Sequence, residues 1–366
     1  MGLVNPSIIN IFIYAIVFIF YKNRIIGTRQ RKTNSCLLFF ICLFSVFAFC
    51  DGDYYHYEEI YNTIIRSKSI ETHMEQVYNF FAYNSIKSYS IFRFYIWGLA
   101  ILFTTLATKE IGVNTNSTLF ILMLVFITTF SYARVSLAMS VAVFGFSLLI
   151  SNRKIKQIGG ILIVASSILF HKTIIFMVAC GIISLLLHDM SRKKLVITLF
   201  ICFILGSALN ILLLQFSNLE IYGGLEGTVL SGQKYLASEQ EESGLGGMIN
   251  GILNKAPYYL TILVYLKLVL KDNFLVLNNK IRFISTFSFI TIIVASLFAF
   301  DFGVNTSIIY YRFLFMAMIP TIIFIGYCWY HKIEYRIIKF IVNIGSMGVV
   351  YKLLYYYYLQ RLGLGV

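Results

Sequence analysis

Long apolar runs separated by short polar segments extend through almost the whole chain. A helix needs about 20 such residues to cross a bilayer, with a usual range of about 17–25. Because the runs are continuous and do not alternate in polarity, they predict helices and exclude the strands of a membrane barrel. The predicted spans are Ile8–Tyr21, Ser35–Cys50, Ile91–Ala107, Thr118–Phe130, Val135–Ile150, Gly159–Phe170, Thr173–Leu187, Leu195–Phe216, Ala256–Leu270, Phe283–Phe300, Ile308–Trp329 and Ile337–Tyr358. The shorter runs need tilt, kinks or polar ends to make up the length.

Composition supports a membrane protein. The 366 residues are 59% hydrophobic and 13% charged, whereas a soluble domain is about 45–50% apolar and about 25% charged. We therefore predict an all-α, polytopic integral membrane bundle of about 12 transmembrane helices, with residues 1–366 as one domain. The net charge of +14 does not indicate nucleic-acid binding, because the basic residues lie in short loops between the apolar runs and form no single face.

Basic and acidic residues divide the connecting segments into two sets. Lysine and arginine gather in alternate loops, and such loops lie on the cytoplasmic side of a membrane. The five basic loops contain Lys22, Arg24, Arg29, Arg31 and Lys32; Arg153, Lys154 and Lys156; Arg192, Lys193 and Lys194; Lys271, Lys280 and Arg282; and Lys332, Arg336 and Lys339. The opposite loops hold most of the acidic residues, so we expect those loops and both termini to lie outside the cytoplasm.

Two of the predicted external segments are large. Residues 51–90 contain aromatic and apolar residues at mixed spacing, which indicates short amphipathic helices on the membrane surface. Residues 217–255 are rich in Gly, Ser and Glu, which is typical of a mobile loop and of a lid over a site. The six cysteines lie within or at the ends of apolar runs without metal-ligand spacing, so we interpret them as core residues.

Two apolar regions are interrupted by charged residues. Arg134 divides Thr118–Ile150, and His171 with Lys172 divides Gly159–Leu187. A charged side chain at membrane depth is costly and usually functional. If each region is a helical hairpin, every basic loop stays on one side, and both interruptions lie on the external side.

The interrupting residues have functional and structural interpretations. Arg134 can bind a phosphate or diphosphate through its planar guanidinium, or it can reach toward the outer lipid headgroups. His171 can transfer a proton or contact a sugar or phosphate, or it can be a turn residue beside the headgroups. For Lys172 we favour the headgroup interpretation.

A third cation follows a pair of tyrosines. Arg312 comes after Tyr311 at the outer end of a predicted span, where it can clamp an anion or anchor the helix in an interfacial aromatic belt. Asp301 ends the preceding span and can pair with it.

Acidic residues follow the second predicted span. Asp51 and Asp53 open the segment DGDYYHY, which includes Tyr54, and Glu75 lies further along. Two carboxylates two residues apart can hold a divalent cation, and one carboxylate can act as a general base. A solvated acidic loop is the alternative. The sequence has no nucleophile motif, phosphate-binding glycine loop or zinc-ligand spacing.

These motifs together resemble a known family. The segment DGDYYHYEEIY resembles the "D-x-D-Y…Y" opening of EpsG-type polysaccharide polymerases, relatives of the Wzy O-antigen polymerases. Glu75 matches a recurrent acidic position, although Gln76 follows it where the family usually has proline. Arg134 through His171 resembles the family's "R…A…G…RK…FH" core, and Tyr311–Arg312 resembles its later arginine element.

The resemblance implies a glycosyltransferase that joins oligosaccharide units carried on undecaprenyl diphosphate at the outer face of the bacterial cytoplasmic membrane. In such an enzyme Arg134, Arg312 and Lys172 would bind diphosphate. Asp51, Asp53, Glu75 or His171 would activate the acceptor hydroxyl. The remaining candidates, Tyr54, Tyr311 and Asp301, would contact the substrate.

The family resemblance also implies partners. A chain-length regulator and a flippase of the same pathway are expected, beside membrane lipids and the lipid-linked oligosaccharide. No cofactor is expected, and a metal is not required because two arginines can stabilise the leaving diphosphate; the Asp51–Asp53 pair leaves metal binding open.

Two other functions remain open from the sequence. A flippase for lipid-linked sugars would place charges along a path near the membrane midplane, ideally in two repeated halves. A polytopic acyltransferase would use a histidine such as His171 as its base. We favour the polymerase because the candidate residues gather at one face and no repeat is visible.

Overall fold

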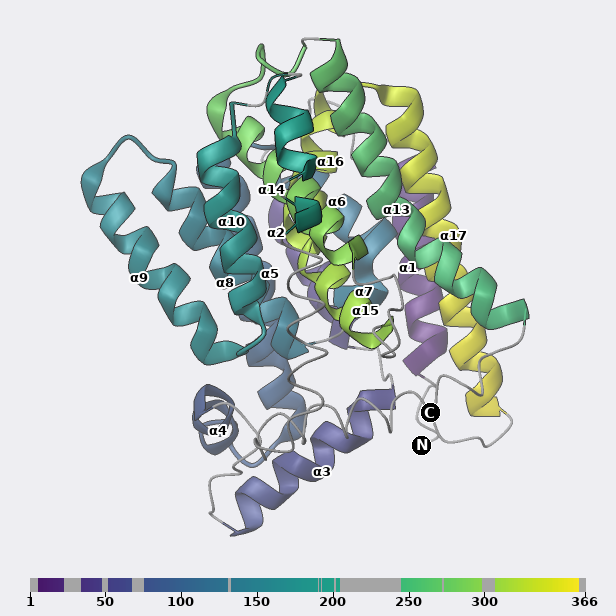
Figure 1. Ribbon diagram of the computed structural model, residues 1–366. Coiled ribbons are helices and arrows are strands. Elements are labelled where there is room, and N and C mark those ends of the chain that lie inside the picture. Colours follow the sequence, from purple (N-terminus) through teal and green to yellow (C-terminus); the bar gives the residue numbers. More distant parts are fainter. Residues whose placement is uncertain are drawn as a thin grey trace.

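The computed structural model of the protein describes residues 6–22, 34–47, 52–67, 76–130, 133–189, 191, 193–200, 202–204, 245–271, 273–297 and 307–361. Every regular element in these residues is a helix, which confirms the predicted all-α class. Most of the helices lie side by side in a bundle, and the helices of residues 52–67 and 76–83 lie across one end (Figure 1). The labelled elements are α1 (Pro6–Lys22), α2 (Asn34–Phe47), α3 (Gly52–Ser67), α4 (Gln76–Tyr83), α5 (Tyr89–Ile111), α6 (Thr115–Ile121), the π-helical turn η1 (Leu122–Phe126), α7 (Ile127–Phe130), α8 (Ala133–Leu149), α9 (Lys154–Phe170), α10 (Ile174–Leu187), α13 (Leu245–Leu270), α14 (Asn279–Leu297), α15 (Ser307–Met316), α16 (Met318–His331) and α17 (Tyr335–Arg361). Residues 193–200 and 202–204 are also helical.

Most of the described helices overlap predicted apolar runs, but the predicted number of spans is not confirmed. Three described helices are long and apolar enough to cross a membrane: Tyr89–Ile111, Asn279–Leu297 and Tyr335–Leu354. A fourth results if α15 and α16, which are bent by 45° relative to each other, count as one span. Helices such as α10, with 14 residues, are shorter than the about 20 residues that a full crossing needs. The count of about twelve therefore stays a prediction.

Helices α3 and α4 occupy the segment that the sequence analysis placed outside the membrane. Both lie at the end of the bundle where α9 ends and α10 begins (Figure 1), and α4 packs against α9 and α5. Tyr61 of α3 shares a very short hydrogen bond with Ser85, which follows α4. The two helices therefore form one small layer over this end, although its position relative to the membrane stays a prediction.

The start of α13 differs from the sequence expectation. Residues 245–255 belong to the segment 217–255 that we predicted as a mobile loop, yet they are helical. Glycine in a helix costs about 1 kcal/mol relative to alanine, so packing must offset this cost. Helix α13 packs along α17, where a Cβ added at Gly348 would lie 3.2 Å from Cβ of Leu253. Residues 217–244 lie outside the described residues.

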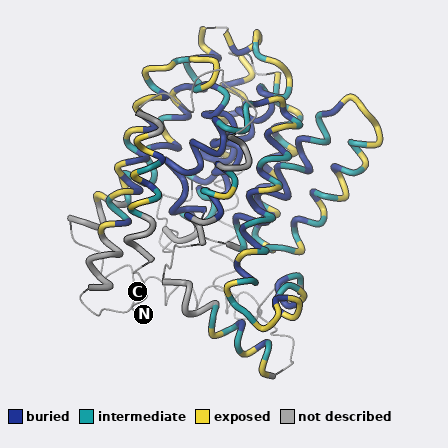
Figure 2. Tube along the Cα trace, turned by 180° about the vertical axis from the view of Figure 1, so that it is seen from behind, coloured by how far each residue is buried: buried dark blue, intermediate teal, exposed yellow. Residues whose placement is uncertain are grey.

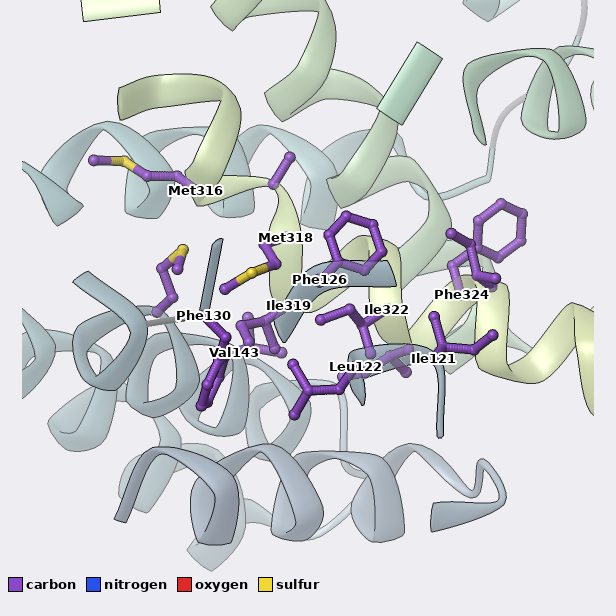
Figure 3. Close-up of a cluster of buried hydrophobic side chains, with 14 of the residues drawn as sticks. Ile121, Leu122, Phe126, Phe130, Val143, Met316, Met318, Ile319, Ile322 and Phe324 are labelled. Atoms are coloured by element: carbon purple, nitrogen blue, oxygen red, sulfur yellow. The ribbon is translucent and has the colours of Figure 1, made fainter. Parts of the chain in front are cut away.

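The core lies where two irregular helical segments meet. One is residues 115–130, which contain η1, and the other is the bent pair α15 and α16. Every residue of the segment 117–130, which includes η1, is buried. Figure 3 shows Leu122 and Phe126 of η1 beside Met318, Ile319 and Ile322 of α16. Figure 2 shows this buried zone at the centre of the bundle. Exposed residues lie along α9, at the edge of the bundle, and at the loops. The helix that contains η1 is thus a central helix, surrounded by protein.

Small residues let neighbouring helices approach closely. A Cβ added at Gly160 of α9 would lie 2.7 Å from the carbonyl oxygen of Gly145 on α8. Hydroxyl groups link other pairs: Thr104 of α5 and Ser140 of α8 are 3.0 Å apart. Such contacts replace the hydrophobic effect as the cause of association where lipid surrounds the helices.

The four described cysteines, Cys42, Cys180, Cys202 and Cys328, are free and buried, as predicted for core residues.

One end of the bundle holds ion pairs between residues far apart in the sequence. Glu110 at the end of α5 pairs with Lys156 of α9 at 2.6 Å and with Lys280 of α14 at 3.2 Å. Two further groups join other helix ends: Glu334 with Lys267 and with Lys271 (3.7 Å), and Asp189 with Arg282 (2.8 Å). The structure thus brings four of the predicted basic loops, or the helix ends beside them, to one end of the molecule. Which side of the membrane this end faces stays a prediction.

Substitution of Gly160 by alanine is expected to weaken the contact between α8 and α9. The added methyl group would meet backbone atoms at 2.7 and 2.9 Å, which cannot move cheaply, and overpacking costs about 1–3 kcal/mol. The measurement is the thermal unfolding temperature of the purified protein in detergent, which should fall by several degrees. Gly159→Ala is the matched control, because nothing lies within 4 Å of its added Cβ. Equal unfolding temperatures for the two variants would show that the close approach has no energetic role.

Candidate functional site

The end of the bundle opposite the ion pairs carries Arg134. This residue lies in the first turn of α8 and is half-buried. The buried Tyr78 of α4 donates its hydroxyl proton to the carbonyl oxygen of Arg134 at 3.1 Å. Ser136 donates to the carbonyl oxygen of Phe130, 3.0 Å away, and so connects α8 to α7. Contacts from two other helices therefore fix the backbone at Arg134.

The turn between α9 and α10 carries the second predicted group. Helix α9 ends at Phe170, and His171 adopts an extended backbone (φ −164°, ψ 118°) before α10 begins at Ile174. The N–H of Ile174 donates to the carbonyl oxygen of His171 at 3.0 Å and closes the turn. The His171 side chain is half-buried, whereas Lys172 is exposed. The hairpin predicted from this interruption is thus present, and only the imidazole is partly enclosed by protein.

An aromatic stack joins this turn region to α15. The rings of Phe176 on α10 and Phe313 on α15 lie 3.9 Å apart between centroids and 10° from parallel. Phe313 directly follows Arg312, which is half-buried. The stack therefore holds the helical turn that carries Arg312 against the beginning of α10, a short distance along the chain from His171. Helix α10 packs against both α8 and α15. The helices beside Arg134, His171 and Arg312 therefore form one contiguous unit.

A further cation, Lys255 on α13, escaped the sequence analysis. Its Nζ lies 4.0 Å from the centroid of the Tyr311 ring and 5.0 Å from that of Tyr310. The hydroxyl groups of Tyr259 and Tyr310 are 2.6 Å apart. Lys255 is the last residue of the segment 217–255, which the sequence predicted as a mobile loop. A lysine directly before an apolar run was the signal that could have identified it.

Arg93 on α5 is the second cation that the sequence analysis missed. Its side chain is only 5% exposed, and its guanidinium carbon lies 4.3 Å from the Trp97 ring centroid and 5.9 Å from that of Tyr89. The Trp97 indole N–H and both side-chain amide atoms of Asn79 on α4 are buried without a hydrogen-bond partner among the described residues. An arginine within an apolar run is the same signal that identified Arg134, but here aromatic residues surround it in the sequence.

Several predicted site residues cannot be placed. Asp51, Glu75 and Asp301 lie outside the described residues. Asp53 and Tyr54 lie in the first turn of α3, and nothing is described of their side chains. The general base and the Asp51–Asp53 cation site therefore stay predictions. Among the described residues, no three His, Cys, Asp or Glu side chains gather in a way that could hold a metal ion.

The described residues at this end favour an anionic, oxygen-rich ligand. Arginine, lysine and histidine side chains can donate several hydrogen bonds to phosphate oxygens. Tyrosine and tryptophan rings can stack on the apolar faces of sugar rings while their polar atoms bind hydroxyl groups. At the opposite end of the molecule, lysine and arginine pair with Glu110, Glu334 and Asp189.

Comparison with known proteins gives one match. The profile of the EpsG family matches residues 33–362. This range includes nearly all of the described helices and all of the predicted site residues. No curated protein and no solved structure matches the chain significantly.

The hydrogen bond from Tyr78 is expected to hold α4 on α8. Tyr78→Phe removes the hydroxyl group that donates to the carbonyl of Arg134, and one such bond contributes about 1 kcal/mol. Hydrogen–deuterium exchange of the peptide 76–83 should therefore become several-fold faster. Tyr330→Phe is the control, since that side chain is 40% exposed near the opposite end of the bundle. Unchanged exchange in Tyr78→Phe would mean that other contacts alone hold α4 in place.

Proposed function

This chain belongs to the EpsG family, and we propose from this membership that it polymerises oligosaccharide repeat units carried on undecaprenyl diphosphate. The product would be a surface polysaccharide such as O-antigen, capsule or exopolysaccharide. The reaction would take place at the outer face of the bacterial cytoplasmic membrane.

The family match is the observation that carries the proposal. It extends over residues 33–362 and so includes both the acidic segment and the later Tyr311–Arg312 element. The apolar helices support a membrane location, and the match to a polysaccharide-polymerase family supports a lipid-linked sugar substrate.

The proposed reaction is a glycosyl transfer between two lipid-linked chains. The hydroxyl oxygen at the non-reducing end of a new unit attacks the anomeric carbon of the growing chain. The bond between that carbon and the diphosphate oxygen breaks, and undecaprenyl diphosphate leaves with the electron pair. The hydroxyl proton passes to a base, for which Asp51, Asp53, Glu75 and His171 are the candidates.

The leaving diphosphate needs positive charge aimed at its oxygens, because negative charge develops there in the transition state. Arg134 supports this role best, since its backbone is held by Tyr78 while its guanidinium keeps a permanent charge. Arg312 and Lys172 are proposed to assist, while Tyr54, Tyr311 and Asp301 are proposed to contact the substrate. No cofactor is required by this scheme.

The prenyl tails require apolar surface beside the site. Helix α9 exposes Ile158, Ile161, Leu162 and Leu169, and it lies at the edge of the bundle (Figure 1). Such a face suits contact with lipid chains. A flippase that delivers the units and a regulator of chain length are the proposed partners in the same pathway.

Loss of Arg134 or His171 is expected to stop polymerisation. In a deletion strain complemented with Arg134→Ala, the ladder of polysaccharide lengths on a gel should be absent, leaving single repeat units. The reason is that removing one donor to a developing negative charge lowers rates about 10²–10³-fold. His171→Ala should give the same result if its imidazole is the base.

The control for this experiment is Arg336→Ala, which removes an exposed arginine at the opposite end of the bundle, and membrane levels of all variants are compared by immunoblot. If single units never reach the outer face in the deletion strain, the protein is a flippase. If the ladder is intact but acyl groups are missing, it is an acyltransferase.

A further inference from the structure

Where α4 covers the bundle, three polar side-chain atoms are buried without a partner. Asn79 of α4 and Trp97 of α5 are each 3% exposed. Both amide atoms of Asn79 and the indole N–H of Trp97 have no hydrogen-bond partner among the described residues. Such groups are rare in folded proteins, because each one loses its bonds to water without replacement. Their presence on two helices that pack together therefore points to a ligand.

The packing of α5 and α8 places Trp97 at the level of Arg134. The two helices run in the same direction, because the end of α5 is paired with the start of α9, the helix that follows α8. Thr104 of α5 contacts Ser140 of α8 at 3.0 Å. Trp97 lies two helical turns before Thr104, and the beginning of α8 lies two turns before Ser140. Trp97 therefore lies beside the first turn of α8, which carries Arg134.

Helix α4 brings Asn79 to the same level. Tyr78, which directly precedes Asn79, donates a hydrogen bond to the carbonyl oxygen of Arg134. Both Tyr78 and Asn79 are buried, so both lie on the face of α4 that meets the bundle. Helix α4 also packs against α5 (Figure 1). Asn79, Trp97 and Arg134 thus come from three helices to one level of the molecule.

The unpaired atoms define what a ligand must offer. The Asn79 amide donates through its nitrogen and accepts through its oxygen, whereas Trp97 only donates. An ionised diphosphate offers only acceptors and would leave the amide oxygen unpaired. A cation would leave both N–H donors unpaired. The hydroxyl and acetamido groups of a sugar both donate and accept, so a sugar can satisfy all three atoms.

The Trp97 ring is held by a cation one helical turn earlier. The guanidinium carbon of Arg93 lies 4.3 Å from the ring centroid, within the range of attraction between a cation and a ring face. The indole N–H projects from the ring edge, so this contact holds the ring without using the N–H. The donor is therefore oriented before a ligand arrives, which lowers the cost of binding.

Because these atoms are covered, α4 has to move away from α5 to admit a sugar ring. The turn between the two helices includes Ile86 and Lys87 in the left-handed region, with φ of 53° and 55°. This backbone conformation is strained, above all for a β-branched residue such as isoleucine. Strain in the turn and unpaired atoms under the helix both raise the energy of the covered arrangement, and both therefore favour its opening.

We propose that Asn79 and Trp97 form a sugar-binding subsite under α4, and that this subsite holds the sugar bonded to the leaving diphosphate. The assignment rests on the proposed polymerase function, in which Arg134 binds that diphosphate. The sugar attached to the diphosphate then lies next to Arg134, at the level of both side chains. Their hydrogen bonds to its hydroxyl or acetamido groups hold the anomeric carbon in place for attack.

The test measures binding to the full-length protein in zwitterionic nanodiscs by calorimetry. One probe is the undecaprenyl-diphosphate monosaccharide extracted from a strain that lacks the enzyme adding the second sugar, so that no complete repeat unit is present. The other is undecaprenyl diphosphate without a sugar. Asn79→Leu should weaken binding of the monosaccharide lipid about tenfold, the loss expected for one or two hydrogen bonds. It should leave binding of undecaprenyl diphosphate unchanged, and Trp97→Phe should act in the same direction.

The thermal unfolding temperature of the ligand-free protein is measured in the same variants. Asn79→Leu removes a buried amide that has no partner among the described residues, so this temperature should stay equal or rise. Tyr258→Phe is the matched control. It also removes a buried hydroxyl without a partner among those residues, but from α13, where the ring packs on Phe126 of η1. It should leave the affinity for both probes unchanged.

Three results would overturn the proposal. An equal loss of affinity for both probes would assign Asn79 to the diphosphate site. Unchanged affinity for both would remove it from the substrate. A lower unfolding temperature in Asn79→Leu, without a selective loss of the monosaccharide lipid, would show that an ordered water satisfies the amide.

Transfer by the wild-type protein is measured separately with complete repeat units. If the monosaccharide lipid binds selectively through Asn79 but no units are joined, the sugar subsite stands and the polymerase function fails. If units are joined while Asn79→Leu binds both probes as wild type does, the polymerase function stands and the subsite fails.

Discussion

Charge inside an apolar bundle is costly, and the two ends of this molecule stabilise their charged residues by different contacts. At one end, Glu110, Glu334 and Asp189 each pair with lysine or arginine from another part of the chain. Such groups largely neutralise one another and tie the helix ends together. At the other end Arg93 and Lys255 contact aromatic rings, which attract a cation through the ring face. The two ends of the bundle therefore hold their charged residues by different kinds of contact.

Close packing at the centre keeps these two ends in a fixed relation. The helix through η1 is buried among its neighbours, and α17 approaches it where a Cβ at Gly345 would lie 2.4 Å from a side-chain carbon of Val125. The break between α15 and α16 lies beside η1 (Figure 3). Both helices that depart from regular geometry thus meet in a dense core, where neighbouring side chains fix each irregular conformation.

The sequence predicted the helices better than it predicted the site. Continuous apolar runs specify helices, and alternate basic loops specify which ends lie together, because both follow from local composition. The turn at His171 followed from a polar interruption in the same way. The glycine-rich start of α13 was mistaken for a loop, since its helix depends on packing against α17. Arg93 and Lys255 were missed because their ring contacts form only in the folded structure. The Trp97 ring beside Arg93 lies one helical turn away, whereas the Tyr311 ring beside Lys255 belongs to a distant segment.

Aromatic residues accompany the cations at this end: the rings of Tyr89 and Trp97 lie beside Arg93, and those of Tyr310 and Tyr311 lie beside Lys255. A ring face can orient a cation, and it also offers an apolar surface on which a sugar ring can stack. Because Tyr310 and Tyr311 come from α15 and Lys255 from α13, this orientation depends on the packing of those two helices against α14. The bundle core, through the contacts of α14 with α13 and α15, thereby fixes how Lys255 lies relative to Tyr310 and Tyr311.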